Sequence, residues 1–599
     1  MSTEVETNRA YGTLPIILIA AVVQGFALYG LHLAIDHDLW PASSPGVLSG
    51  LYAIAVFVPL TLQLLSTHAR ERALWALLAA LAVAYFYFGW HDGIYVRDPR
   101  DALRGDGWVT LAFLLTLVWL IALPFAQLRL SSGRWRAPYE GFFAVAWRNK
   151  VLLAEAVAFT GLFWLLLFLW QELFHSLGFD FFRELFSEPI FVYPVTSLVF
   201  GGALHLIGSV ERMTRVVIEQ VLSVLKWLAL LAGLILALFS IALVLKLPRL
   251  VMTGERIIGA AWLLWLVAVT VLLVNAAYRD GSFSRPYPRW IGLALRAVVP
   301  LTILVALTAA YALILRVVTY GFTVERVWAL IVAAAALAYS IGYGIAAFNR
   351  TSWMGGISRV NVAVALGLIA TLALTLTPIL SPYRIAANSQ YEMILAGEHS
   401  DQSDEVVTPE GMYGTPYHYL RFQAGRYGTQ RLEALTKLDD HPRAAQIREA
   451  AQLASQIGRP PAPVSRPQVD EKLAHLVMYP QGAELDAQLR SRVRADLLRP
   501  HLASFFAFRQ KQQWGGLFVD LNGDDTEEFV LLFADHGIVY QQTEGNWRLM
   551  GTALPEAGVQ EGDLARALER REVSTIEPVW RELKVGTLVY RVRQELPWP

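Results

Sequence analysis

Long apolar runs alternate with short polar connectors along the first two thirds of the chain. Eleven of these runs reach the roughly 18 to 25 residues that an α-helix needs to cross a bilayer. The sixth run is the least regular, because it contains Pro194 and His205. The pattern predicts an all-α polytopic transmembrane bundle of about 11 helices within residues 1–381. The expected spans are 14–35, 47–65, 73–90, 108–126, 151–172, 190–209, 222–245, 257–277, 293–315, 327–348 and 361–381.

The pattern becomes polar after residue 381. Residues 382–457 are expected to form a polar loop and short helices, and residues 458–469 a Pro-rich linker that begins "GRPPAPVSRP". Residues 470–599 predict a C-terminal soluble α+β domain that contains a β-meander. Its expected elements are a helix at 484–512, strands at 516–520, 527–534, 537–542 and 546–550, a helix near 561–571 and a strand at 586–594.

Composition agrees with a membrane protein. The 599-residue chain is 55% hydrophobic and 17% charged, which is far more apolar than an ordinary soluble protein. Its 50 basic and 50 acidic residues cancel, so no net charge favours a nucleic-acid partner. The chain has no cysteine, which excludes disulfides, thiolate metal sites and a cysteine nucleophile.

Lysine and arginine divide unequally between the two sides of the predicted bundle. The side that carries the N-terminus holds fifteen of them and the other side nine. The loop at 127–150 holds five, and the loop at 36–46 holds none. The positive-inside rule therefore places the N-terminus in the cytoplasm. Eleven crossings would then place residues 382–599 on the outer side.

Few ionisable residues lie in the middle of the predicted spans, which lowers the expectation of a proton-coupled transporter. Polar residues do occur there, and they either line a cavity or form hydrogen bonds between helices. These residues are Gln24, Tyr339, Ser340 and Tyr343. At the inner side, "RAPYEGFFAVAWRNK" places aromatic residues among Arg136, Arg148 and Lys150. This mixture predicts an anchor in anionic lipid.

Histidines and carboxylates gather at the predicted outer ends of three helices. His32 and Asp36 lie one turn apart on the first helix, His91 ends the third, and His175 ends the fifth. Imidazole and carboxylate ligands in this arrangement form a candidate divalent metal site or a general acid and base pair. The alternative is that they are unrelated polar residues at the membrane interface.

The stretch "GLFVDLNGDDTEEFVLLFA" carries the second candidate site. Asp520, Asn522, Asp524 and Glu528 occupy positions 1, 3, 5 and 9 of a loop between two predicted strands. This alternation can direct several oxygens at one calcium ion, although the loop is not an EF-hand. The same residue types also form Asx turns without any metal, so both interpretations stay open.

Three further stretches carry a family resemblance. In "RVVTYGFTVERVWAL", Gly321 permits a sharp turn and Thr323 can cap the following helix. This stretch lies between "LLLFLWQELFHSLGFDFF" upstream and "YLRFQAGRYGTQRLEALTKL" downstream. The set, in this order, resembles the bacterial membrane family catalogued as domain of unknown function 4153 (DUF4153). The resemblance implies a bacterial inner-membrane protein with many helices, and it supplies no reaction and no site residues. The expected periplasmic position of the C-terminal domain comes from the eleven crossings and the positive-inside rule.

The sequence leaves three functional hypotheses. It contains no Gly-Lys-Thr/Ser phosphate loop, no Gly-x-Ser-x-Gly elbow and no His-Glu-x-x-His helix. The leading hypothesis is a non-enzymatic envelope scaffold or sensor that presents an extracytoplasmic domain to envelope protein partners. The alternatives are a transporter or flippase of an envelope component, and a membrane enzyme or metal site at the outer histidines and carboxylates. Whether the protein is an enzyme stays open.

Overall fold

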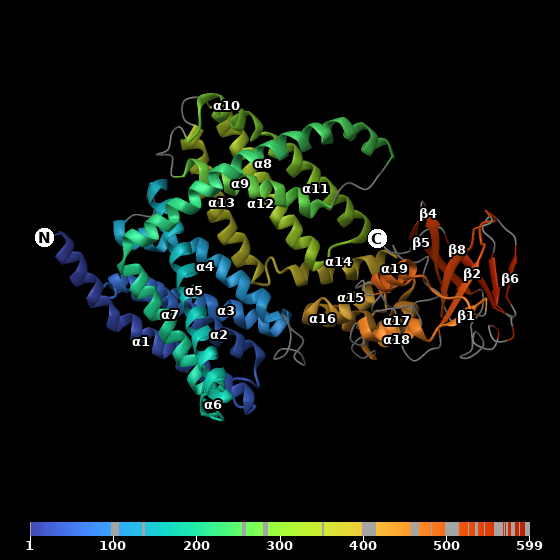
Figure 1. Cartoon of the computed structure of the whole chain (residues 1–599), viewed down its shortest axis with the longest axis horizontal. Helices are drawn as coiled ribbons and strands as arrows, with labels where there is room; N and C mark the ends of the chain where they lie inside the picture. The colour runs from blue at the N-terminus through green and yellow to red at the C-terminus, as the bar shows by residue number, and fades with distance from the viewer. Residues whose placement is uncertain are drawn as a thin grey trace. The chain divides into compact units, whose positions relative to one another are not determined.

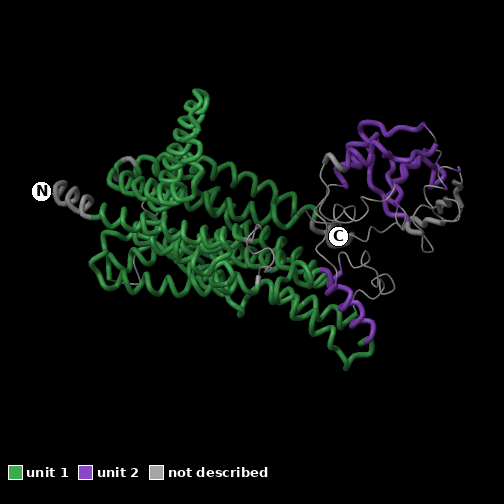
Figure 2. Tube along the Cα trace, turned by 90° about the horizontal axis from the view of Figure 1, so that it is seen from below, with its two compact units in different colours: residues 1–398, 419–444 green, residues 399–418, 445–599 purple. Residues whose placement is uncertain are grey.

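The chain folds into two compact units, Met1–Glu398 with Tyr419–Ala444 and His399–His418 with Ala445–Pro599 (Figure 2). The first is the membrane bundle and the second carries the sheet. The computed structural model describes residues 2–96, 107–133, 138–253, 259–279, 286–349, 353–397, 415–456, 466–480, 482–497, 514–524, 526–533, 537–543, 545–555, 567, 570, 573–576, 582–585 and 588–593.

The described residues contain eleven helical segments long and apolar enough to cross a membrane. This confirms the predicted number and order, including the sixth span, which is helical through Pro194. The chain is therefore a multi-pass membrane protein. The segments are Thr13–Asp36, Pro45–Leu64, Arg72–Tyr95, Trp108–Ser132, Tyr139–Ser176, Pro189–Ser209, Thr214–Lys246, Ala260–Tyr278, Arg289–Tyr320, Val324–Phe348 and Trp353–Thr375.

The helices of the bundle form two groups that follow each other in the sequence (Figure 1). Each group has its own apolar core, one centred on α2, α3 and α4 and the other on α8, α9, α11 and α12. The first group comprises α1 (Ser2–Asp36), α2 (Pro45–Leu64), η1 (Ser66–His68), α3 (Arg72–His91), η2 (Asp92–Val96), α4 (Gly107–Ser132), α5 (Tyr139–Ser176), α6 (Phe181–Ser187) and α7 (Pro189–Ser209). The second comprises α8 (Glu211–Thr253), α9 (Ala260–Tyr278), α10 (Arg289–Val298), α11 (Leu301–Tyr320), α12 (Val324–Phe348) and α13 (Trp353–Thr375).

Helices α2 and α3 pack with their backbones almost in contact. Gly46 and Gly50 on α2 face the end of α3, where Gly89 lies. A Cβ added at Gly89 would lie 2.5 Å from the carbonyl oxygen of Ser49. Small residues four positions apart permit this close approach. In lipid, where the hydrophobic effect does not drive helices together, the resulting van der Waals packing stabilises their association.

Polar side chains inside the bundle connect helices. Gln63 donates its amide to Gln24 Oε1 at 3.1 Å, and Gln24 in turn donates to the Val56 carbonyl at 3.0 Å. Tyr343 donates its hydroxyl to Asn361 Oδ1 at 2.6 Å. Of the two sequence-based interpretations, hydrogen bonding between elements is therefore confirmed for Gln24 and Tyr343.

The turn between α11 and α12 has the predicted local structure. Gly321 adopts a φ of 67°, and Thr323 Oγ1 accepts a hydrogen bond from the backbone of Arg326 at 3.4 Å. The Phe322 amide also donates to Ser389 Oγ of α14 (Pro382–Ala396) at 2.9 Å. Such contacts explain why residues 382–398, which the sequence assigned to a separate polar segment, belong to the compact unit of the bundle. Two more helices follow, α15 (Pro416–Phe422) and α16 (Gly425–Thr436).

The second unit contains a mixed sheet of eight strands in the order β1-β2-β3-β4-β5-β8-β7-β6. Strands β2 to β5 are consecutive and antiparallel, which confirms the predicted meander. Strand β1 pairs with β2 in parallel. The strands are β1 (Val477–Tyr479), β2 (Gly515–Val519), β3 (Glu528–Leu532), β4 (Gly537–Thr543), β5 (Asn546–Pro555), β6 (Val573–Ile576), β7 (Glu582–Val585) and β8 (Leu588–Arg593).

Strand β3 lies in the middle of this unit and is buried along its whole length. Phe529 and Leu531 face the core formed with α18 (Arg466–Ala474) and α19 (Ala487–Leu497), and Val530 faces the opposite core. Helix α17 (Ala444–Gln456) precedes them. The helix expected at 484–512 is described only from 487 to 497, and most of the linker and of the helix near 561–571 lies outside the described residues.

Candidate binding site

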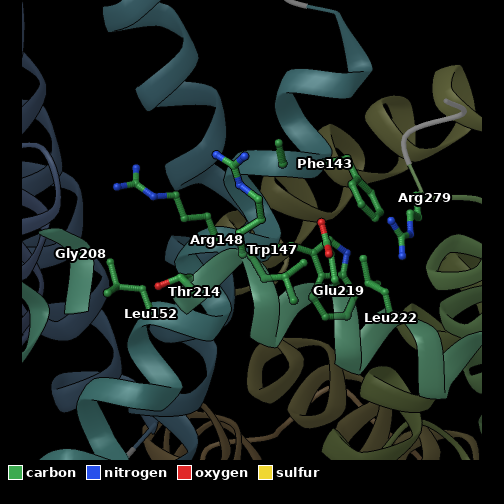
Figure 3. A pocket seen from close by; sticks show the side chains of 12 residues that line it. Phe143, Trp147, Arg148, Leu152, Gly208, Thr214, Glu219, Leu222 and Arg279 are labelled. Carbon is green, nitrogen blue, oxygen red and sulfur yellow. The ribbon is translucent and has the colours of Figure 1, made fainter. Parts of the chain in front are cut away.

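A pocket of about 420 Å³ lies where α5 and α7 of the first helix group meet α8 of the second (Figure 3). Its volume falls within the range of roughly 300–1,000 Å³ that small-molecule sites occupy. The pocket is lined by Phe143, Ala144, Trp147, Arg148, Leu152, Gly208, Thr214, Arg215, Ile218, Glu219, Leu222 and Arg279.

Two helical stripes form most of the wall. On α5 the stripe contains Phe143, Trp147 and Arg148, and on α8 it contains Thr214 and Glu219 with their neighbours on the same face. On each helix the lining residues form adjacent pairs that recur after three or four positions, which places them on one broad face of the helix. Each stripe combines apolar and charged side chains, so the pocket has both an apolar and a polar lining.

The polar lining is dominated by positive charge. Three arginines, Arg148, Arg215 and Arg279, line the pocket together with one carboxylate, that of Glu219. Glu219 lies between Arg148 and Arg279 in Figure 3. Within the described residues, Arg148 and Arg215 form no ion pair. Lys150 adds a further cation beside the pocket, with its ammonium 5.5 Å from the centre of the Trp147 ring.

Arg279 has an unusual backbone conformation. It caps the end of α9 with a φ of 54° and a ψ of −131°. Residues other than glycine rarely adopt positive φ, and such strain concentrates at functional sites. The strained turn carries the Arg279 side chain to the wall of the pocket.

The pocket suits an amphiphile with a negatively charged headgroup. Guanidinium groups donate paired hydrogen bonds to phosphate and carboxylate oxygens. Trp147 and Phe143 supply amphipathic and apolar surface of the kind found where a membrane meets water. The pocket also lies at one end of four spans. The beginnings of the fifth and seventh and the ends of the sixth and eighth all fall on the same side of the membrane.

The residues of the predicted outer metal site do not lie close to one another. The His32 ring lies 5.3 Å from the ring of Tyr193, and His175 Nδ1 lies 2.6 Å from the Asp180 carboxylate. His91 instead contacts Tyr427 of α16, with 3.0 Å between Nε2 and the hydroxyl. Among the residues that the structure describes, no three His, Asp or Glu side chains form a group that could hold a metal ion. Each of these three histidines contacts another residue instead. Asp36 does not belong to a metal-binding group with them in the described part of the chain.

The Asp520 loop uses its own side chains to hold its backbone. Asp520 Oδ1 accepts from the Gly523 amide at 2.6 Å, and Asp524 Oδ1 accepts from the Thr526 amide at 2.8 Å. Glu528 Oε2 accepts from the Leu521 amide at 2.8 Å. The two aspartate bonds are those of Asx-type turns, and the Glu528 bond joins the two ends of the loop. They account for the loop without a cation, and calcium binding by these residues stays a prediction.

Asn522 separates the acidic groups of this loop. Its amide donates to Asp524 Oδ2 at 2.9 Å and to Glu528 Oε1 at 3.0 Å, while its Oδ1 accepts from the Asp524 amide at 2.9 Å. Burial raises the pKa of Glu528, and the nearby Asp524 and Asp520 charges raise it further. Hydrogen bonds from Asn522 and Thr526 lower the pKa of Asp524. The loop thus keeps one buried and one exposed carboxyl in different electrostatic environments.

Replacing Asn522 by alanine is expected to loosen the β2–β3 hairpin by about 1–2 kcal/mol, because three hydrogen bonds are lost and two acidic groups lose the donor between them. Hydrogen–deuterium exchange of residues 515–533 in the full-length protein measures this opening. Asn546→Ala, which removes one exposed bond from Gln488, is the control. If exchange in the Asn522→Ala variant differs from the wild type only when calcium is present, the loop is a cation site rather than a self-sufficient turn.

The sequence indicated only half of the pocket. The α5 stripe was interpreted as a lipid anchor because Trp147 and Arg148 are adjacent to each other in a cationic segment. The α8 stripe carries the same kind of signal, with Thr214, Arg215 and Glu219 on one face of "TRVVIEQVL", but nothing in its pattern names α5 as its neighbour. Comparison of the chain with protein-family models, with curated proteins and with solved structures returned no match.

Proposed function

We propose that this chain is a non-enzymatic scaffold or sensor of a bacterial inner membrane, which engages anionic lipid through the pocket between α5 and α8. The pocket carries this proposal, because three arginines line it together with Trp147 and Phe143. The bundle would hold the C-terminal α+β module outside the cytoplasm, where envelope proteins could bind it. The resemblance to the DUF4153 family is part of the same proposal.

The lipid part of the proposal predicts a charge-specific loss of binding. Replacing Arg148 and Arg215 together by glutamine should weaken the binding of phosphatidylglycerol about 30-fold, since each basic residue near an anionic surface contributes about 1 kcal/mol. Native mass spectrometry of the detergent-solubilised protein, titrated with phosphatidylglycerol and with phosphatidylcholine, measures this. Phosphatidylcholine binding should stay unchanged, because its headgroup has no net charge.

Arg359→Gln is the matched control for this experiment. Arg359 is an exposed arginine on the same predicted side, and it donates only to the Gly355 carbonyl of its own helix at 3.2 Å. An equal loss in Arg359→Gln and in the double variant would show that net charge, and not the pocket, attracts the lipid. That outcome would remove the support for the proposed site.

The predicted orientation has its own test. Paired reporters fused after Pro599, one active only outside the cytoplasm and one fluorescent only inside it, should report the outer side. This expectation combines the eleven spans with the excess of arginine and lysine on the N-terminal side. A cytoplasmic reporter signal would reverse the assignment and make the second unit a cytoplasmic module.

Transport or flipping of an envelope lipid is a second candidate function. It is favoured by the position of the pocket between two helix groups that have separate apolar cores. A fluorescent lipid assay in reconstituted vesicles separates the two functions. A scaffold binds phosphatidylglycerol without accelerating its movement between leaflets, whereas a flippase accelerates it and loses this activity in the Arg148 and Arg215 double variant.

A further inference from the structure

A second, smaller pocket of about 350 Å³ lies on the other side of the bundle. Tyr95 follows the third span and Pro378 follows the eleventh. Both are ends of odd-numbered spans, so they lie opposite the pocket between α5 and α8. The remaining wall comes from α14 and α16, which contribute Arg384, Asn388 and Arg431. We call this hollow the α14–α16 pocket.

One wall of the α14–α16 pocket is built from fixed aromatic rings. The Tyr95 and Tyr427 rings stack with centroids 4.9 Å apart and planes inclined by 20°. His91, only 1% exposed, contacts the Tyr427 hydroxyl at 3.0 Å between Nε2 and the oxygen, which restrains this ring. Tyr95 itself belongs to η2, a short π-helix, and such elements occur frequently at functional sites. The wall is therefore in place before any ligand binds.

The α14–α16 pocket also contains two guanidinium groups with unused donors, those of Arg384 and Arg431. Arg431 donates Nε to Asn388 Oδ1 at 2.9 Å, and Arg384 donates Nη1 to the Pro378 carbonyl at 3.0 Å. Each of these bonds uses one of the five N–H donors of an arginine. In the described part of the chain, no carboxylate lies within 4.0 Å of either guanidinium.

Arg431 is also held in place. The Arg431 guanidinium lies 5.0 Å from the centre of the Tyr391 ring, so the stacking and the bond to Asn388 act together on it. Fixed donors lose less conformational entropy when a ligand binds. Two guanidiniums in one hollow, with no carboxylate of the described residues paired to them, favour a compact ligand with about two negative charges.

We propose that the α14–α16 pocket binds a phosphomonoester group, held by Arg384 and Arg431 against the Tyr95–Tyr427 wall. A phosphomonoester carries about −1.5 to −2 charges at neutral pH and offers three acceptor oxygens. Guanidinium groups match these oxygens in pairs. Asn388 and Gln430, which also line the pocket, offer amide groups for hydroxyls next to the phosphate.

The Tyr427 side chain is compatible with a phosphomonoester dianion in the pocket. Burial raises the pKa of Tyr427 to about 12, and the Tyr95 ring beside it acts in the same direction, while Arg384 lowers it. Tyr427 is therefore neutral at physiological pH and does not repel an anion.

A phosphomonoester occurs both in soluble compounds and in lipid headgroups, and the experiment distinguishes these two sources. The full-length protein in neutral detergent is titrated with inorganic phosphate and with glycerol 3-phosphate by isothermal calorimetry. In parallel, it is reconstituted in phosphatidylcholine nanodiscs with or without phosphatidic acid, and its thermal stability is measured. Saturable binding of either soluble probe indicates a soluble ester, and stabilisation by phosphatidic acid alone indicates a lipid headgroup.

Arg384→Gln with Arg431→Gln should weaken the binding of the successful probe about 10-fold or more, because two charge-assisted contacts are lost. Arg426→Gln is the control, since Arg426 lies 5.8 Å from the Tyr95 ring centre but does not line the pocket. If the double variant unfolds, Arg384→Gln alone replaces it, because this side chain is exposed. The proposal is overturned if no probe binds saturably, or if Arg426→Gln reduces binding as strongly. Arg384→Gln with Arg431→Gln should cause the same loss in the Arg148→Gln and Arg215→Gln background, where the proposed lipid site is already removed, which separates this result from the proposed function.

Discussion

Replacing Gly89 by alanine is expected to lower the free energy of unfolding of the membrane bundle by about 1–3 kcal/mol, the usual penalty for overpacking. The added methyl group would lie 2.5 Å from the Ser49 carbonyl oxygen and 2.8 Å from the Gly50 nitrogen. Carbon atoms in favourable contact are roughly 3.5–4.0 Å from their neighbours. The atoms in the way belong to the α2 backbone, so the two helices must separate to admit the methyl group.

Gly161 on α5 and Gly202 on α7 provide matched controls for this prediction. A Cβ at either position meets no atom within 4 Å. Alanine favours the helix over glycine by about 1 kcal/mol in such open positions, so Gly161→Ala and Gly202→Ala should be neutral or stabilising. Thermal denaturation of the three detergent-solubilised variants, followed by size-exclusion chromatography, measures the difference. A Gly89→Ala protein as stable as Gly161→Ala would mean that α2 and α3 do not pack through their backbones.

The local pattern of the sequence was sufficient to predict the architecture. Eleven spans follow from apolar runs, and strands β2 to β5 follow from alternation and turn residues, because both signals are contained within a few consecutive positions. Strands β1, β6 and β7 were missed. The three-residue strand β1 is defined by parallel pairing with β2, more than thirty residues away, and no local pattern reports that pairing.

The sites could be predicted only in part, because they depend on which helices are neighbours. His32, His91 and His175 have suitable chemistry at suitable helix ends, yet they pack beside Tyr193, Tyr427 and Asp180 instead of each other. The stripes on α5 and α8 can each be recognised in the sequence, but the sequence does not show that these two helices are neighbours. Choice of neighbour is a property of the whole bundle, since every helix presents a similar apolar surface to lipid.

Asn361→Leu is the second substitution from which we expect a large loss, about 2–4 kcal/mol of unfolding free energy. Asn361 of α13 donates to Tyr139 of α5 at 2.6 Å and to Asn275 of α9 at 2.7 Å, and accepts from Tyr343 of α12 at 2.6 Å. Three bonds at about 0.6 kcal/mol each contribute about 2 kcal/mol in a membrane. The estimate is higher because buried partners left unsatisfied add to the loss, and the Tyr343 side chain is 1% exposed.

Ser358→Ala on the same helix is the control, because its hydroxyl bonds only to the Met354 carbonyl one turn away. Its thermal stability in detergent should stay close to that of the wild type. A double-mutant cycle then identifies the network itself. Tyr343→Phe should be destabilising in the wild-type background and nearly neutral in the Asn361→Leu background, because the bond it removes is already absent there. Equal effects of Tyr343→Phe in both backgrounds would show that the bond between Tyr343 and Asn361 does not contribute to stability.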